Sequence, residues 1–328
     1  MLAATFATAI LIAGGNFNSL VVVLDFQGVD KAAKLDAKML FDLVKVSFGV
    51  VAGAGALVAL VVAYRRQRVD EAGAHREATR LHTERFTAAV EQLGSDSPAV
   101  RLGGVHALAG LADDAPNQSL RQTCIDVLCA YLQLPYTPDP GGDPAYQEEH
   151  HRYLALRKVR HTILRLIGNH YRLPAGAYRS WQGCDLDLSG VTVDCDMNFS
   201  GAVFSGAKAI FSRARFSDGH VYFANATFAG GEVYFIGCAF SSSSVSFEGA
   251  LFSGGTTFFG GARFSGGEVD FTRAMFSSGN VHFNAVFSGG KVNFSEATGK
   301  APRFLLDHVG TPAPPSVVLP PAWTTPVL

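Results

Sequence analysis

Residues 247–276 read FEGALFSGGTTFFGGARFSGGEVDFTRAMF, and this stretch decides the fold. Its phenylalanines recur in pairs about every twelve residues: Phe247 and Phe252 form one pair, and Phe259 and Phe264 form the next. A strict short period with regularly placed aromatic residues is typical of a solenoid, in which stacked repeats bury one continuous core.

The pairing extends from Leu188 to Phe294, and in most pairs a small residue lies two positions before the second aromatic residue. A further apolar residue, usually valine, lies two positions before the first. Polar residues and glycine alternate with these positions, which is the pattern of a short strand with one buried face. We therefore expect outward side chains at Ser246, Glu248, Arg263 and Ser265. We expect one structural stack of buried rings, made of Phe199, Phe204, Phe211, Phe216, Phe223, Phe228, Phe235, Phe240, Phe247, Phe252, Phe259, Phe264, Phe271, Phe276, Phe283 and Phe294.

Each unit contains two more residues than two five-residue faces require. The extra residues fall in Ser-Gly-Gly stretches, as at 265–267 and 288–290, where glycine tolerates the backbone of a corner. Two architectures stay open: two units in each four-sided turn, giving roughly five turns that rise ~4.8 Å each, or one unit in each turn. We favour the first, because two rings in so small a turn would crowd a close-packed interior.

The pattern resembles the pentapeptide-repeat family, whose five-residue unit has a small residue two positions before a central Leu or Phe. Phe199-Ser-Gly-Ala-Val-Phe204 and Phe247-Glu-Gly-Ala-Leu-Phe252 fit that rule, whereas the inserted pair of residues departs from it. The resemblance implies an all-β, right-handed quadrilateral β-helix, the pentapeptide-repeat solenoid, which we place at residues 181–300.

Two uncharged runs, Leu2 to Leu24 and Val46 to Tyr64, are each long enough to cross a bilayer, which takes about 20 apolar residues. We expect two transmembrane helices within residues 1–64, although Asn16 and Asn18 dilute the first run and leave a single span open. Gly49 and Gly53 are spaced for a helix contact, so both a homodimer and packing within the hairpin stay open.

Arginines follow the second run at once, in Arg65-Arg66-Gln67-Arg68, whereas the lysines between the two runs are balanced by aspartates. The positive-inside rule therefore predicts that the C-terminal domain is cytoplasmic. We expect a multi-pass protein of a bacterial cell membrane. The lipid bilayer is accordingly one expected partner.

An α-helical linker domain is expected at residues 65–180, between the membrane α-hairpin and the solenoid. It comprises a stalk that continues the second span, and a helical hairpin from Pro98 to Leu134 that resembles a single HEAT-like repeat. It ends in a basic helix at about 148–171. That helix could attract lipid or nucleic acid, but we favour a cap whose apolar stripe covers the first turn of the solenoid. Residues 301–328 are rich in proline and predict an extended tail, with Trp323 as an anchor.

No nucleophile, phosphate-binding loop or dinucleotide motif stands out in the sequence. The five cysteines form no CxxC pair, so we expect reduced, buried thiols. His150 and His151 follow Glu148 and Glu149, but no further ligand lies at a spacing typical of a metal site. We therefore expect no enzyme activity, no catalytic residue, no cofactor and no metal.

The favoured function is a non-enzymatic, membrane-tethered scaffold whose solenoid presents a rigid surface to a cytoplasmic protein that the sequence does not identify. One alternative is an oligomerising membrane effector. Another is a DNA mimic that regulates an enzyme such as DNA gyrase, as some proteins of the pentapeptide-repeat family do. A DNA mimic needs an acidic rod, yet residues 196–300 contain seven acids and seven bases. No nucleic-acid partner is expected for so neutral a rod.

Overall fold

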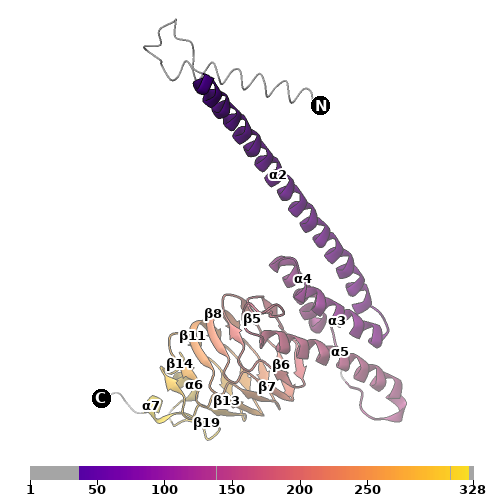
Figure 1. The fold of residues 1–328 in the computed structure, drawn as a ribbon. Coiled ribbons are helices and arrows are strands. Elements are labelled where there is room, and N and C mark those ends of the chain that lie inside the picture. Colours follow the sequence, from indigo (N-terminus) through magenta and orange to yellow (C-terminus); the bar gives the residue numbers. More distant parts are fainter. Residues whose placement is uncertain (1–36, 138, 311, 325–328) are drawn as a thin grey trace. The chain divides into compact units, whose positions relative to one another are not determined.

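The computed structural model describes residues 37–137, 139–310 and 312–324 (Figure 1). The chain divides into two compact units, Met1–Glu77 and Ala78–Leu328, which are described separately. The first expected membrane run, Leu2 to Leu24, lies outside the described residues.

Helix α2 (Ala37–Leu93) runs through the second uncharged run and across the boundary between the two units. Part of this helix is long and apolar enough to cross a membrane, and its most apolar window has no buried residue. It is the one such helix among the described residues. Its helical conformation continues without a break through the predicted stalk to Leu93.

In the second unit, the predicted hairpin consists of α3 (Pro98–Asp113) and α4 (Gln118–Gln133). Asn117 caps α4 by accepting a hydrogen bond from the Leu120 N–H. A side chain at Gly104 would lie 2.5 Å from the Leu93 backbone nitrogen, so glycine permits α3 to approach the end of α2 this closely. The core here consists mainly of aliphatic side chains, among them Leu93, Val105, Leu108, Ile125, Leu128, Leu132, Val159, Ile163 and Ile167.

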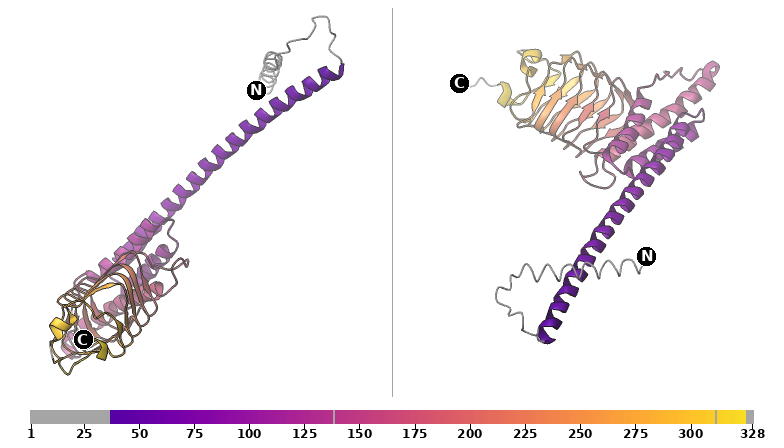
Figure 2. Two further views of the ribbon diagram at one scale, coloured as in Figure 1. Left: turned by 90° about the vertical axis from the view of Figure 1, so that its left-hand side faces the viewer. Right: turned by 90° about the horizontal axis from the view of Figure 1, so that it is seen from above.

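From Leu186 onward the chain forms a parallel β-solenoid of about six turns (Figures 1 and 2). The first face contains β4 (Val203–Phe204), the first residues of β8 (Thr227–Tyr234) and β11 (Leu251–Phe258), β14 (Met275–Phe276) and β18 (Thr298–Gly299). The second contains β1 (Leu186–Asp187), β5 (Lys208–Ile210), the later residues of β8 and β11, and β15 (Asn280–His282). The third contains β2 (Thr192–Asp194), β6 (Arg215–Asp218), β9 (Ala239–Phe240), β12 (Arg263–Phe264) and β16 (Val286–Phe287). The fourth contains β3 (Met197–Asn198), β7 (His220–Tyr222), β10 (Ser244–Ser246), β13 (Glu268–Asp270), β17 (Lys291–Asn293) and β19 (Val317–Val318).

One turn of the solenoid contains two of the twelve-residue units. Phe228 pairs with Phe252, and Phe252 pairs with Phe276, so the register advances by 24 residues in each turn. Of the two architectures considered from the sequence, this is the favoured one, with two units in each four-sided turn. The solenoid has about six turns against the roughly five expected, and residues after 300 contribute the last strand, β19, to the fourth face.

The phenylalanine rings stack in four columns along the solenoid axis. Successive rings at Phe223, Phe247 and Phe271 have centroids 4.9 and 4.7 Å apart, which matches the spacing between neighbouring strands. The columns are Phe199–Phe223–Phe247–Phe271–Phe294, Phe204–Phe228–Phe252–Phe276, Phe211–Phe235–Phe259–Phe283 and Phe216–Phe240–Phe264, all of them buried.

The inserted residues form the corners between the first and second faces and between the third and fourth. A side chain at Gly266 would lie 1.9 Å from the Ser241 carbonyl oxygen, so the corners of successive turns are in close contact. Of the expected outward residues, Arg263 and Ser265 are exposed, whereas Ser246 and Glu248 are half-buried. Glu248 is partly covered because it forms an ion pair with Arg273 of the next turn.

The first turn is covered by α5 (Gln147–Tyr171) and also by α4. The Tyr171 ring packs against Phe199 and Phe204, with both centroid distances 5.9 Å. The Gln122 side chain on α4 accepts a hydrogen bond from the Asp185 N–H and donates one to the Asp185 carbonyl, both at 2.8 Å. The backbone N–H and carbonyl of Asp185, at the open edge of the first turn, could otherwise pair with another chain. They are instead hydrogen-bonded to a side chain of the same chain.

A buried carboxylate, Asp113 at the end of α3, joins the hairpin to the entry of the solenoid. It accepts hydrogen bonds from Trp181 Nε1 at 3.0 Å and from Arg179 Nε at 2.8 Å, and its Oδ1 lies 3.2 Å from His170 Nε2. Burial alone would raise the pKa of Asp113, but the hydrogen bonds from His170 and Arg179 outweigh it and lower that pKa.

The prediction of an extended tail after residue 300 was wrong. The segment contributes β19, which pairs with β17, and the short helices α6 (Leu305–Val309) and α7 (Pro321–Thr324). Trp323 packs against Phe276 and Phe294 and donates a hydrogen bond to the Gly299 carbonyl. Without this segment the rings of the last turn would be exposed. Covering them holds the proline-rich segment in a defined structure, although it has no repeat of its own.

Candidate interaction surface

An aromatic column lies on the outside of the second face, one position before the buried column of Phe211, Phe235, Phe259 and Phe283. Tyr234 stacks on Phe258 with ring centroids 5.2 Å apart, and Phe258 stacks on His282 at 5.1 Å. Phe304 continues the column at 5.9 Å from His282, and half of its surface is exposed. Because the strands are in register, Tyr234, Phe258 and His282 project at the same point of successive turns. Phe304 follows Arg303, the residue that pairs with His282. We call Tyr234, Phe258, His282 and Phe304 the outer column.

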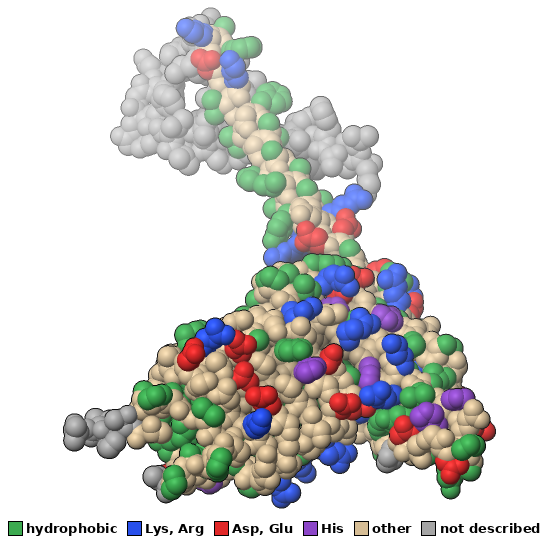
Figure 3. Space-filling model, turned by 90° about the horizontal axis from the view of Figure 1, so that it is seen from below, with side chains coloured by type: hydrophobic (Ala, Val, Ile, Leu, Met, Phe, Trp, Pro, Cys, Tyr) green, Lys and Arg blue, Asp and Glu red, His purple; other side chains and the backbone are tan. Residues whose placement is uncertain are grey.

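A second apolar strip lies across the glycine corner on the first face. It contains Leu251, which is half-buried, and Met275, which is 44% exposed. Lys208 and Glu232 border the outer column and form a long ion pair of 4.0 Å. Basic and acidic side chains are interspersed over the side of the second unit that Figure 3 displays. Tyr234, Phe258 and His282 are half-buried and Phe304 is exposed, so the outer column is a partly exposed strip of rings.

A different cluster lies where α5 meets the first turn of the solenoid. His161 lies on α5, Asp194 ends β2 and Cys195 follows it, and the potential ligand atoms of these three residues lie within 4.8 Å of one another. His161 Nε2 lies 2.9 Å from Asp194 Oδ1. Arg157 donates through Nε to Asp194 Oδ2 at 2.8 Å and through a second nitrogen to the Asp194 carbonyl at 2.9 Å.

These residue types can bind a metal ion, but their contacts do not favour it. Both carboxylate oxygens of Asp194 are already hydrogen-bonded, and the Arg157 cation lies where a metal ion would be repelled. Burial, with a smaller contribution from Asp194, raises the pKa of the Cys195 thiol to about 12, so the thiolate that metals prefer is scarce at neutral pH. The cluster is better described as a latch between α5 and the first turn.

The latch predicts a dependence of stability on pH. Burial alone would raise the pKa of Asp194, but hydrogen bonds from His161 and Arg157 outweigh it and lower that pKa to about 2. A depressed carboxyl pKa stabilises the folded state above the unfolded value of about 4, and this contribution of about 2 kcal/mol is lost as the pH falls through the folded value. In urea titrations, wild type should therefore exceed Asp194→Asn in stability at pH 6, and the difference should shrink between pH 4 and pH 2. A constant difference would show that the carboxylate charge does not stabilise the latch.

The basic helix has fewer free cations than its sequence suggests. Arg157 is held by Asp194, and Arg160 is buried, donates to the Leu132 carbonyl and lies over the Tyr136 ring. Arg152 lies 3.7 Å from Glu148. These contacts fit the cap interpretation of α5 better than a surface for lipid or nucleic acid.

The other side chains considered from the sequence lie in different places. His150 pairs with Asp139, at 2.6 Å from Nδ1 to the carboxylate, and His151 joins no group of three potential ligands within the described ranges. All five cysteines are free thiols; Cys195 is half-buried and the others are buried.

The outer column was missed from the sequence, although a signal for it exists. A large side chain directly precedes the first inward phenylalanine of every second twelve-residue unit, at Ile210, Tyr234, Phe258 and His282. The period of this signal is 24 residues and not twelve, so it emerges only when two units are aligned as one turn.

No protein-family model matches the chain, and no match was found among curated proteins or solved structures. The solenoid is consistent with a pentapeptide-repeat-like fold.

Proposed function

We propose that this protein is a non-enzymatic, membrane-tethered scaffold of the pentapeptide-repeat type, with a right-handed quadrilateral solenoid that docks a protein partner in the cytoplasm. In this proposal α2 is the second of two spans in a bacterial cell membrane, and the arginines after Tyr64 keep the C-terminal domain inside.

The observation that carries the proposal is the outer column. Aromatic side chains are enriched among the residues that dominate protein interfaces, because they bury much apolar area at a low cost in side-chain entropy. Here the rings stack on one another, so their edges are fixed in place before a partner arrives.

The backbone conformation at the end of the outer column also supports docking there. Phe304 has φ 68°, a left-handed conformation that is uncommon for a bulky residue. The left-handed turn places Phe304 next to His282, where it extends the apolar strip.

The proposal favours a partner with an apolar surface over a basic nucleic-acid enzyme. A DNA mimic would need negative charge along the rod, whereas acids and bases are equal in number over residues 196–300.

Photocrosslinking of the full chain in its native membrane tests this function. Replacing Phe258 by p-benzoylphenylalanine should give discrete crosslinked species, and the same replacement of Arg263, an exposed residue of the third face, should not. With the partner then purified, Tyr234→Ala should weaken its binding about tenfold or more, because truncating a central aromatic side chain costs at least about 2 kcal/mol. Equal crosslinking from both positions, or unchanged affinity of Tyr234→Ala, would contradict docking at the outer column.

A further inference from the structure

The last corner of the solenoid differs from the corners before it. In the preceding turn, Phe252 pairs with Phe276 and Phe258 pairs with His282, so both corners contain five residues. In the last turn, Phe276 pairs with Gly299 and His282 pairs with Arg303. Only three residues, Lys300, Ala301 and Pro302, thus lie where the turn below has five.

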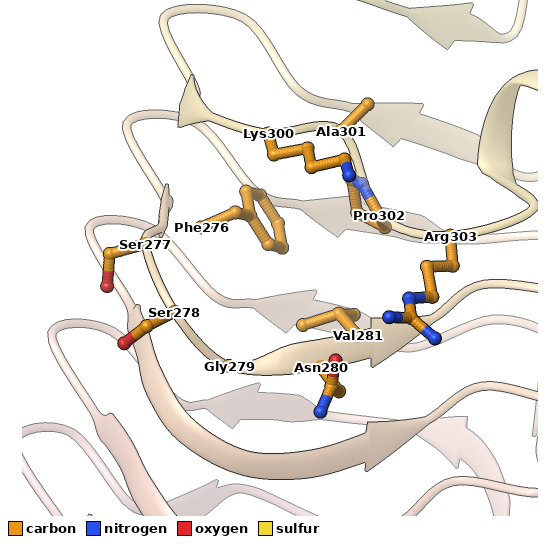
Figure 4. A pocket seen from close by; sticks show the side chains of 10 residues that line it. All are labelled: Phe276, Ser277, Ser278, Gly279, Asn280, Val281, Lys300, Ala301, Pro302 and Arg303. Atoms are coloured by element: carbon orange, nitrogen blue, oxygen red, sulfur yellow. The ribbon is translucent and has the colours of Figure 1, made fainter.

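The missing residues leave a hollow. Corners of earlier turns are in contact: a side chain at Gly254 would lie 2.2 Å from the Ala229 carbonyl oxygen. Above Ser277, Ser278 and Gly279, by contrast, the shortened corner leaves a space of about 180 Å³. We call this hollow the notch, and Figure 4 displays the side chains that line it.

Two cationic side chains border the notch, and no carboxylate lines it. Lys300 and Arg303 are both exposed, and neither forms an ion pair with any acid of the described ranges. In Figure 4 both side chains extend on the Pro302 side of the notch, with Asn280 below them. The remaining lining residues are Phe276, Ser277, Ser278, Gly279, Val281 and Ala301.

Hydrogen bonds fix the backbone of both cationic residues. The Lys300 N–H donates to the Phe276 carbonyl at 3.2 Å, and the Arg303 N–H donates to the Val281 carbonyl at 2.8 Å. The Arg303 carbonyl in turn accepts from the Phe283 N–H at 2.8 Å. A ligand in the notch would therefore need to order two side chains but no loop, which lowers the entropic cost of binding.

We propose that the notch binds a tetrahedral oxyanion, either as inorganic phosphate or as the phosphate group of a phosphomonoester. Guanidinium presents a planar pair of donors to phosphate oxygens, and the lysine ammonium adds a compact charge. Two such contacts at a solvent-exposed site correspond to a dissociation constant of about 1 mM. The site is distinct from the outer column and does not depend on the docking function.

Calorimetric titration of the full chain in nonionic detergent micelles with inorganic phosphate, at constant ionic strength, tests the proposal. Lys300→Met and Arg303→Met should each weaken binding about tenfold, since each removes one charge-assisted hydrogen bond. Lys291→Met, which removes an exposed lysine from the fourth face, should leave it unchanged. An equal loss in all three variants, or no saturable binding to wild type, would overturn the site.

Inserting Ser-Gly after Gly299 tests the geometry apart from the charges. The insertion restores a five-residue corner and should abolish phosphate binding although both cations remain. Unchanged binding would show that the cations alone are responsible and would overturn the notch as the site.

Glycerol 3-phosphate distinguishes the two sources of the anion. Tighter binding of this ester than of inorganic phosphate would support the site and assign it to a phosphomonoester such as a lipid headgroup, and the reverse order would assign it to free phosphate. If neither ligand competes with the other, they do not share one notch and the proposal fails.

Discussion

Phe259→Ala is expected to lower the free energy of unfolding by about 3–5 kcal/mol. Phe259 is fully buried, and its ring lies 4.9 Å from Phe235 on one side and 4.7 Å from Phe283 on the other. The edges of Phe247 and Phe271 also contact it. The backbone of each turn is hydrogen-bonded to both neighbouring turns, so the solenoid cannot collapse into the cavity, and the cost should fall in the upper part of that range.

Urea unfolding followed by tryptophan fluorescence measures this effect. The two tryptophans of the chain, Trp181 and Trp323, lie near opposite ends of the solenoid, so they report on both. Arg263→Ala is the matched control, because this side chain of the same turn is exposed and its loss should change stability by no more than about 0.5 kcal/mol. Equal midpoints for the two variants would contradict the column of stacked rings as the source of stability.

Asp113→Ala is expected to cost about 3–5 kcal/mol. The substitution removes the acceptor for the buried Trp181 Nε1–H and leaves His170 without its carboxylate partner. Each buried polar group that loses its partner keeps the full penalty of desolvation. The destabilisation should be greatest at the junction between the helices and the solenoid, because these hydrogen bonds join the end of α3 to the residues that enter the first turn.

Asp114→Ala provides the control at the next position. Asp114 is exposed and accepts a hydrogen bond from Tyr178, so its loss should cost about 1 kcal/mol or less. Both variants are best compared in a Trp323→Phe background, where the fluorescence arises from Trp181 alone. If Asp113→Ala unfolds at the same urea concentration as Asp114→Ala, the buried carboxylate does not hold the junction together.

The repeating part of the fold could be predicted from the sequence because each turn contacts only its neighbours. A buried ring at Phe247 demands a buried ring at Phe271, so two twelve-residue periods of the sequence make one 24-residue turn of the structure. The same reasoning indicated which positions face inward, but it overestimated the exposure of Ser246 and Glu248. The partner that covers part of Glu248, Arg273, lies 25 residues away in the sequence.

The ends of the solenoid could not be predicted in this way. The pairing of Gln122 with the Asp185 backbone, and the packing of Trp323 on the last rings, join segments that share no pattern. The outer column and the notch also escaped notice. The outer column is hard to recognise because it repeats only once per 24-residue turn. The notch is hard to recognise because it arises from two residues that are missing from a single corner.

The register of 24 residues per turn has a consequence for how such a protein changes over evolution. Duplication of one turn within the gene would insert four strands whose neighbours above and below already fit them, and would lengthen the rod by about 4.8 Å. The helical cover at one end and the tryptophan cover at the other would be unaffected. Natural selection could thus adjust the distance between the two ends in fixed steps, and each added turn would bring one more aromatic side chain to the outside.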